Sequence, residues 1–495
     1  MKLILALDQG TTSCRSIVFD ETGKAIGVSQ KEITQIYPQP GWIEHNPVEI
    51  YQTQLDTIRE VVNKKNIPVN QLVACGITNQ RETTVIWNKK TGLPLHNAIV
   101  WQDRRTERIC AQLHNRNLEK QIFEKTGLKI DPYFSATKIS WLLTFLKDTI
   151  TDSNDIAFGT IDSWLIWNLT NGESHLTDVT NASRTMLFDI LKGSWDTALL
   201  KLFNIPFEIM PTALPSSSFF GSISKNIFGK SIPITGVAGD QQSSLFGHAG
   251  FTSGITKNTY GTGCFMLMHT GEKKVRSDNG LITSLAVQVD GKLNYVIEGS
   301  IFIGGAVFQW MRDELKIISS SDKVEEIASQ APENHEVYLV PAFSGLGAPY
   351  WKSDVRGSIF GLSRSTNSSH IVRAGLESIA FQSLELMESM NSDFNSFQKT
   401  SVAELRVDGG ASKNNLLMQI QADILNIPIL RPKTIETTAL GVAFLAGIKV
   451  GVFKSLSSIE KLWEIDRLFE PSLNDDFRLS KIAGWKKAIR QSLTK

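Results

Sequence analysis

The sequence predicts an α/β protein that consists of two domains with similar folds. Apolar runs typical of strands alternate with segments of helical periodicity along the chain. A strand, a polar turn containing glycine and threonine, and a second strand occur near residue 3 and again near residue 255. The length of 495 residues is sufficient for two to four domains at roughly 100–200 residues each. We place the boundary after residue 248, where Gly247, Gly250 and Gly254 interrupt the chain, which gives domains 1–248 and 249–495.

The first domain is expected to begin with antiparallel hairpins. The segments Leu3–Leu7, Ser16–Phe19 and Ala25–Val28 have the composition of strands, and Asp20–Gly23 has the composition of a turn. The further elements expected in this domain are strands at 72–77, 84–87 and 98–101, a helix at 104–115, and a helix capped by Asp162 that runs through Trp164, Leu165 and Leu169.

The second domain is expected to begin with the same pattern of strand, turn and strand. Strands are predicted at Ile255–Tyr260 and Cys264–Met268, on either side of a turn at Gly261–Gly263. A later strand at Leu405–Val407 leads through Asp408-Gly409-Gly410 into a helix at Asn414–Leu425. Three apolar residues lie on one face of that helix: Leu416, Ile420 and Ile424.

Composition and charge exclude several functional classes. The net charge is +1 without a long run of one sign, so bulk charge does not favour nucleic acid or an anionic membrane as a partner. The four cysteines form no C-x-x-C pair and the eight histidines have no metal-ligand spacing, which argues against a disulfide framework or a zinc site. The apolar start is too short for a signal or membrane-spanning segment. We therefore expect a cytoplasmic protein.

The segment after the first strand has the residues of a phosphate-binding turn. Gly10 permits a tight turn, and the hydroxyl groups of Thr11, Thr12 and Ser13 can face phosphate oxygens, with Arg15 adding positive charge. Asp8, at the strand end, is suited to hold Mg²⁺ through water. An ordinary hairpin with a polar turn has the same composition.

Two further turns have a similar character. Asn258–Gly263 contains a G-x-G sequence, and Asp408–Asn414 places two glycines between a strand and a helix. Each has a common structural alternative, since G-x-G turns are frequent and Asn414 can simply cap a helix. Neither is a Walker A loop. Three such turns in two similar halves nevertheless predict one nucleotide held between the domains.

An acceptor site is suggested by polar residues at two other strand ends. Arg81 and Glu82 together offer donors and acceptors for adjacent hydroxyl groups, although a surface ion pair is the commoner arrangement. Asp240 can act as a general base towards the attacking hydroxyl, or as a helix cap. Trp101 and Phe265 can form an apolar wall, or simply belong to the core.

These segments resemble the FGGY family of carbohydrate kinases nearly from end to end, and within it the members that phosphorylate glycerol. The resemblance is carried by long strings in the same order, at residues 7–13, 41–45, 76–84, 180–186, 238–242, 257–264 and 341–351. It implies two ribonuclease-H-like (actin/Hsp70/sugar kinase) domains flanking an interdomain cleft. The implied reaction is the ATP-dependent phosphorylation of glycerol to sn-glycerol 3-phosphate, by a homodimer or homotetramer.

The resemblance also implies roles for individual residues. The implied glycerol ligands are Arg81, Glu82, Tyr133, Asp240 and Gln241, with Trp101 and Phe265 against the carbon chain and Asp240 as the base. The implied ATP-binding residues are Thr11, Thr12, Ser13, Arg15, Thr262, Gly305, Gln309, Gly410 and Asn414. We expect Mg²⁺ to be held through water by Asp8 and Asp240.

Two departures and two alternatives accompany this interpretation. Cys14 stands where the family has a second serine, and the short segment Ser224–Lys230 lacks both the Gly-Gly and Arg pattern that binds fructose 1,6-bisphosphate and the histidine that some members phosphorylate. One alternative is a kinase of the same family that acts on another polyol or sugar. The other is a nucleotide-dependent switch of the actin or chaperone type, which has no need of Arg81, Glu82 and Asp240 together.

Overall fold

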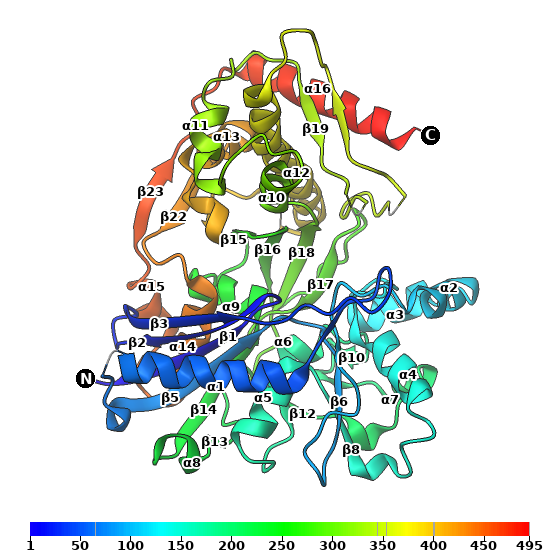
Figure 1. Ribbon diagram of the computed structural model, residues 1–495, viewed down its shortest axis with the longest axis vertical. Helices are drawn as coiled ribbons and strands as arrows, with labels where there is room; N and C mark the ends of the chain where they lie inside the picture. The colour runs from blue at the N-terminus through cyan, green and yellow to red at the C-terminus, as the bar shows by residue number, and fades with distance from the viewer. Residues whose placement is uncertain (65, 344, 353, 399–400, 495) are drawn as a thin grey trace.

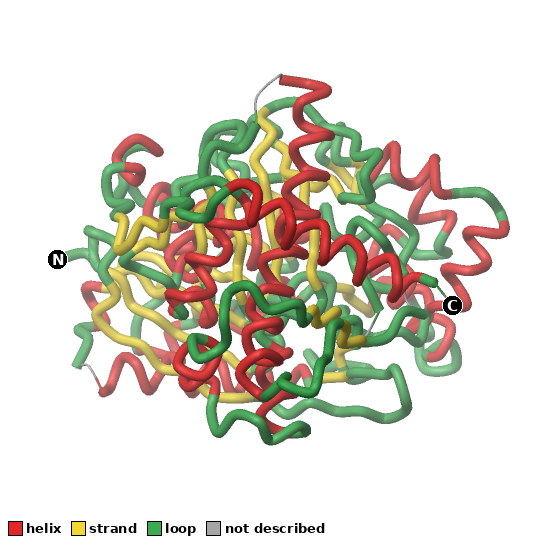
Figure 2. Tube along the Cα trace, turned by 90° about the horizontal axis from the view of Figure 1, so that it is seen from above, coloured by secondary structure: helices red, strands yellow, loops and turns green. Residues whose placement is uncertain are grey.

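The computed structural model describes residues 1–64, 66–343, 345–352, 354–398 and 401–494. Ser344, within the sequence string at 341–351, lies outside these ranges. The half of the chain that begins at the N-terminus forms the lower part of the molecule in Figure 1, and most of the other half forms the upper part. The two termini lie on opposite sides of the molecule (Figure 2). In the part of the chain described, no helix is long and apolar enough to cross a membrane.

The first half is built on a six-stranded sheet with the order β13-β14-β5-β1-β2-β3. β1 pairs antiparallel with β2, and β2 with β3, which confirms the predicted hairpins. β5 runs parallel to β1, and β14 parallel to β5. The strands span β1 Leu3–Gln9, β2 Ser13–Phe19, β3 Ala25–Glu32, β5 Leu72–Asn79, β13 Ser222–Ile223 and β14 Ile232–Gly239.

The second half contains a seven-stranded sheet with the order β17-β18-β16-β15-β21-β22-β23. β15, β16 and β18 form an antiparallel meander, and β21 and β22 follow parallel to β15. Strands β18, β16, β15, β21 and β22 thus repeat the arrangement of β3, β2, β1, β5 and β14. The strands span β15 Thr256–Tyr260, β16 Cys264–Gly271, β17 Ile282–Leu285, β18 Tyr295–Ile301, β21 Leu405–Asp408, β22 Ile429–Pro432 and β23 Ile465–Phe469. The predicted repeat and the α/β fold class are confirmed.

Helices from both halves cover the first sheet. α1 (Pro47–Lys64) and α5 (Ile161–Leu169) pack on one face. The other face is covered by α14 (Thr437–Lys449), which comes from the second half of the chain (Figure 1). Glycine makes this approach possible, because a Cβ atom on Gly76 of β5 would lie 2.4 Å from the carbonyl oxygen of Val442.

The two halves are also joined by a close helix crossing. α9 (Asp240–Gly247) packs against both α14 and the second sheet. A Cβ atom on Gly441 of α14 would lie 1.9 Å from the carbonyl oxygen of Ser243. The two helices therefore touch backbone to backbone at this point.

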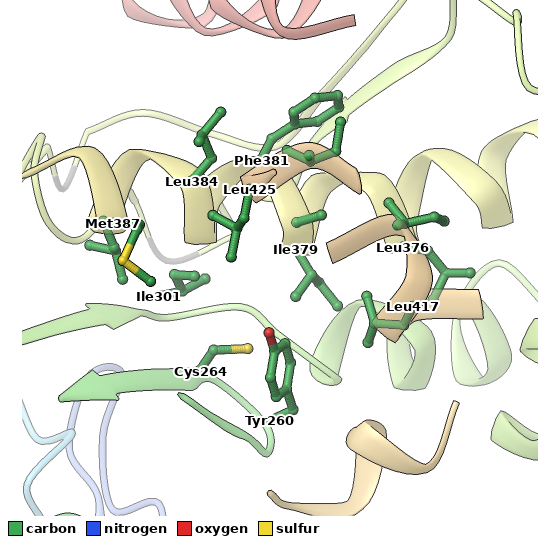
Figure 3. Packing of buried hydrophobic residues seen from close by; sticks show 14 of the residues in the cluster. Tyr260, Cys264, Ile301, Leu376, Ile379, Phe381, Leu384, Met387, Leu417 and Leu425 are labelled. Carbon is green, nitrogen blue, oxygen red and sulfur yellow. The ribbon is translucent and has the colours of Figure 1, made fainter. Parts of the chain in front are cut away.

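The core of the second half lies between its sheet and two helices (Figure 3). Tyr260, Cys264 and Ile301 project from the strands towards α12 (Ser368–Gln398) and α13 (Asn415–Leu425), where they meet apolar residues of both helices. Asn414 accepts a hydrogen bond from the backbone N–H of Leu417 and so caps α13, as one of the two interpretations of this residue predicted.

Shorter elements complete the structure. In the first half they are β4 Glu44–His45, β6 Val85–Asn88, β7 Ala98–Ile99, α2 Glu107–Asn115, α3 Glu119–Thr126, α4 Ser135–Phe145, β8 Ile156–Gly159, β9 Leu176–Asp178, α6 Val179–Ala182, β10 Phe188–Asp189, β11 Ser194–Trp195, α7 Thr197–Leu202, β12 Thr212–Leu214 and α8 Lys225–Phe228. In the second half they are α10 Ala306–Asp313, α11 Val324–Ala328, β19 Tyr338–Val340, β20 Ser358–Phe360, α15 Leu456–Glu460 and α16 Asp475–Leu493.

Two predicted helix caps are wrong. The N-cap of α5 is Thr160, while Asp162 lies within the first turn and accepts hydrogen bonds from the hydroxyls of Thr160 (2.5 Å) and Thr177 (2.6 Å). Likewise Asp240 is the first residue of α9, after Gly239 as N-cap, so its carboxylate is not required to cap the helix.

Candidate active site between the two sheets

The polar segments of the first half meet at one edge of its sheet. In the parallel register, Gln9 of β1 lies beside Asn79 of β5, which lies beside Gly239 of β14. The turn after β1, the Arg81-Glu82 pair and Asp240 therefore follow three neighbouring strands at the same edge. Parallel strands that end together bring residues distant in sequence to one site.

The turn between β1 and β2 carries the predicted hydroxyl groups. The backbone N–H of Gly10 donates to the carbonyl oxygen of Ser13 (2.9 Å), which closes the turn. The Thr11 hydroxyl accepts a hydrogen bond from Trp101 Nε1 (2.9 Å), and the Thr12 side chain is exposed. The turn thus presents hydroxyl and backbone N–H groups at the sheet edge.

Asp8 lies beneath this turn among other charged groups. Burial raises its pKa to about 6, Arg15 opposes that increase, and the negative charges of Glu436 and Asp240 add to it. Within the described residues no cluster of three histidine, cysteine or acidic side chains is arranged to hold a metal. Asp8 and Asp240 offer carboxylate oxygens of the kind that Mg²⁺ accepts when it keeps most of its water.

Arg81 is the centre of a buried charge network. Its Nε lies 3.1 Å from Oδ1 of Asp240, and its two terminal nitrogens donate to the Glu298 carboxylate at 2.6 and 3.0 Å. Nη1 also donates to Gln242 Oε1 (3.1 Å). Burial alone would lower the pKa of Arg81, but Glu298, Glu82 and Asp240 raise it, so the guanidinium stays charged. The Asp240 side chain is 31% exposed and remains accessible to a substrate.

Glu82 is held in an unusual backbone conformation. Its φ of 63° lies in the left-handed region, which is uncommon for a residue other than glycine. Arg184 Nε donates to its carboxylate (2.5 Å), and Ser135 Oγ donates to its carbonyl oxygen (2.9 Å). Burial raises the pKa of Glu82, and the positive charges of Arg184 and Arg81 oppose that increase. Strain of this kind occurs preferentially at functional sites.

Aromatic residues enclose the site on another side. The ring of Trp101 makes edge contacts with those of Tyr133 (centroids 5.4 Å apart) and Phe265 (6.1 Å). Phe265 belongs to β16, so this wall is shared by the two halves. Gln241, beside Asp240, accepts a hydrogen bond from Lys257 Nζ (2.5 Å). All the residues predicted to bind the hydroxylated substrate therefore lie in one region.

The predicted nucleotide residues of the second half form a separate group. Thr262 accepts backbone hydrogen bonds from Gly304 (2.8 Å) and Ala306 (3.1 Å), and Gly305 donates to the carbonyl oxygen of Gly261 (2.9 Å). Gln309 lies one turn further along α10 and is exposed.

The third turn lies beside this group. A Cβ atom on Gly409 would lie 2.5 Å from the carbonyl oxygen of Tyr260, so the turn after β21 touches the end of β15. Gly410 has open space beside its Cα atom, and Asn414 caps the helix that follows. The structure thus brings Thr262, Gly305 and Gly410 together.

Four side chains at the site were not predicted. They are Arg184, Lys257, Glu298 and Glu436, and all are charged. Glu298 is the one charged residue of the fully buried strand β18. This is the sequence signal that could have identified it, because a buried charge requires a partner. Glu436, directly before α14, pairs with Arg15.

The chain is similar to known proteins over its whole length. The N-terminal domain of the FGGY family of carbohydrate kinases matches residues 3–247, and the C-terminal domain of the same family matches residues 256–450. A glycerol kinase of Leptothrix cholodnii is 52% identical over 495 residues, which is all of both chains. The structure of Plasmodium falciparum glycerol kinase with ADP superposes with a TM-score of 0.91 at 39% identity, over 100% of this chain and 99% of that one. A gluconate kinase of Lactobacillus acidophilus shares the fold, with a TM-score of 0.88 at 24% identity over 99% of this chain and 98% of that one.

Proposed function

The chain belongs to the FGGY family of carbohydrate kinases, and we propose that it transfers the terminal phosphoryl group of ATP to glycerol, forming sn-glycerol 3-phosphate. The observation that carries this proposal is the accessible Asp240 carboxylate beside Arg81, at the sheet edge that also bears the hydroxyl-rich turn. A proton acceptor next to a phosphate-binding turn is the arrangement that phosphoryl transfer to a hydroxyl requires.

Glycerol is proposed to bind among the buried polar groups. Arg81 and Glu82 offer a donor and an acceptor for neighbouring hydroxyl groups, and Asp240, Gln241 and Tyr133 complete the polar side. Trp101 and Phe265 contact the carbon chain. The small apolar wall beside several charged groups suits a triol better than a long sugar.

Asp240 is proposed as the general base. Its carboxylate takes the proton of the attacking hydroxyl as the new oxygen–phosphorus bond forms and the bond to the leaving ADP oxygen breaks. Arg81 Nε, 3.1 Å from Oδ1, holds the carboxylate in place during this step. A positioned base contributes typically 10²–10⁴-fold to such a reaction.

ATP is proposed to lie between the two halves. The phosphates face Thr11, Thr12, Ser13 and Arg15 on one side and Thr262 on the other, and the remaining nucleotide contacts are Gly305, Gln309, Gly410 and Asn414. Asp8 and Asp240 would hold Mg²⁺ through water, and the bound ion would neutralise charge on the phosphate oxygens.

Location and assembly complete the proposal. ATP as a substrate and four unpaired, buried cysteines favour the cytoplasm. A homodimer or homotetramer is proposed from the family resemblance, and analytical ultracentrifugation of the purified protein tests it.

A coupled assay tests the proposed reaction. ADP release is measured with glycerol, xylulose or gluconate as the acceptor, and the product is identified with a dehydrogenase specific for sn-glycerol 3-phosphate. We expect glycerol to give the highest kcat/KM. Higher kcat/KM with xylulose or gluconate would assign the enzyme to another substrate of the family, and ATP binding without stimulation by any acceptor would favour the nucleotide switch.

A further inference from the structure

Glu298 brings a carboxylate from the second half into the acceptor site of the first. It lies on β18, its side chain is fully buried, and both oxygens have partners. Oε2 accepts from Arg81 Nη1 (2.6 Å), and Oε1 accepts from Arg81 Nη2 (3.0 Å) and from Arg184 Nη2 (3.2 Å). Burial would raise the pKa of Glu298, but Arg184 and Arg81 lower it to about 2, so the group is a carboxylate at neutral pH.

This contact determines which way Arg81 points. A bidentate pair fixes the plane of a guanidinium as well as its position. With both terminal nitrogens on Glu298, the remaining Nε faces Asp240 at 3.1 Å. Gln242 supports the same orientation from α9 through its hydrogen bond to Nη1.

The same carboxylate acts on Glu82 through a second arginine. Arg184 donates from Nη2 to Glu298 and from Nε to Glu82, so its guanidinium bridges the two carboxylates. Both arginines are almost fully buried. Glu298 therefore orients two side chains, Arg81 directly and Glu82 through Arg184. Both are side chains to which the proposed function assigns the binding of the glycerol hydroxyl groups.

Charge balance at the site depends on Glu298 as well. The two guanidinium groups face three carboxylates, those of Glu82, Glu298 and Asp240. Without Glu298, the two guanidinium groups would face the carboxylates of Glu82 and Asp240 with one negative charge fewer.

We propose that Glu298 is a positioning residue of the acceptor site, which orients Arg81 and, through Arg184, Glu82, so that the site is complete only while the two halves are in contact. The proposal rests on the proposed function for the identity of the acceptor, glycerol. It predicts that glycerol binding depends on the second half even in the absence of nucleotide.

The test compares Glu298→Gln with Glu377→Gln. Glutamine keeps the size of Glu298 but turns one acceptor into a donor that faces Arg81. Glu377 is the matched control, because it is a buried carboxylate of the same half, with Arg373 Nε at 3.2 Å and Lys481 Nζ at 2.8 Å, away from the site. Glycerol Kd is measured by calorimetry without nucleotide, together with Tm, both KM values and kcat.

Three results are expected for Glu298→Gln. Glycerol Kd rises at least 10-fold, KM for ATP changes less than twofold, and kcat falls. Glu377→Gln is expected to lower Tm with glycerol Kd unchanged. If Glu298→Gln does not fold, Glu298→Asp keeps the charge but is too short for the bidentate pair, and it should also raise Kd.

Two outcomes would overturn the proposal. The first is a folded Glu298 variant with the wild-type glycerol Kd, and the second is an equal increase in Kd in Glu377→Gln, which would indicate a general effect of lost stability. The proposed function is tested separately by wild-type turnover of glycerol. Should the wild type prefer another acceptor, the same comparison is made with that acceptor.

Discussion

Arg15 of β2 and Glu436, the residue before α14, form an ion pair that joins the two halves of the chain. Arg15 Nε donates a hydrogen bond to Oε1 of Gln30 in the first half (3.2 Å), while Glu436 belongs to the second half. Both side chains are partly exposed. The proposed phosphate-binding arginine is therefore paired with a carboxylate of the second half.

Glu436→Gln should tighten ATP binding, because the phosphates no longer compete with a carboxylate for Arg15. A partly exposed pair contributes about 0–1 kcal/mol, so KM for ATP should fall by up to about fivefold at low salt and less at high salt. KM for glycerol should not change. The control is Glu464→Gln, which removes an exposed pair with Lys433. An increase in KM for ATP would mean that Glu436 orients Arg15 productively.

Asp240→Asn should separate binding from chemistry. The amide oxygen can still accept from Arg81 Nε, but the group no longer takes a proton. We expect kcat to fall by about 10²–10⁴-fold, with glycerol Kd within a few-fold of the wild type. Single-turnover kinetics and calorimetry give the two quantities. Turnover close to that of the wild type would remove Asp240 from the role of base.

Arg81→Lys should impair acceptor binding although the charge is kept. The planar guanidinium of Arg81 contacts Asp240, Glu298 and Gln242 through different nitrogens, and the single ammonium nitrogen of lysine cannot contact all three. The loss of one hydrogen bond between charged groups costs about 1.5–3 kcal/mol, so KM for glycerol should rise about 10- to 100-fold. Arg105→Lys, another buried arginine with two acidic partners, controls for the substitution itself and should leave KM for glycerol unchanged.

Buried His269 should make the protein less stable at acidic pH. The side chain is 7% exposed, and burial lowers its pKa to about 4, from an ordinary value near 6.5. The folded state thus binds fewer protons than the unfolded state between pH 4 and 6.5, so the free energy of unfolding rises with pH in that window and levels off above it. The effect is at most about 3 kcal/mol.

Urea unfolding of His269→Gln across this pH range tests the prediction. The variant should show a shallower dependence of the unfolding free energy on pH. An unchanged slope in His269→Gln would show that other groups cause the acid sensitivity.

Local sequence signals predicted the first strand of each sheet and the turn after it well. They predicted contacts between residues distant in sequence poorly. β1 and β15 were identified because an apolar run followed by a glycine turn is a local property. Glu298 was missed because its partner Arg81 is 217 residues away, and no local pattern encodes that distance. The cap assigned to Asp162 was wrong because α5 begins one residue earlier, at Ile161, and the carboxylate instead accepts from Thr177, 15 residues later.

The site residues were found through family resemblance more than through composition. Arg81, Glu82 and Asp240 each had a common structural alternative, and only the parallel register of β5 and β14 brings them to one edge. Their individual roles stay predictions until the variants are measured. The boundary after residue 248 also stays a prediction.

The cover that α14 provides for the first sheet has a consequence during synthesis. Ile4, Ala6, Ala74 and Ala238 emerge from the ribosome within the first half of translation, yet the helix that buries them begins at Thr437. At about 5–20 residues per second, the interval of nearly 200 residues lasts on the order of 10–40 s. The nascent chain therefore exposes an apolar sheet face for that time, which makes the unfinished first half a natural client of chaperones that bind nascent chains.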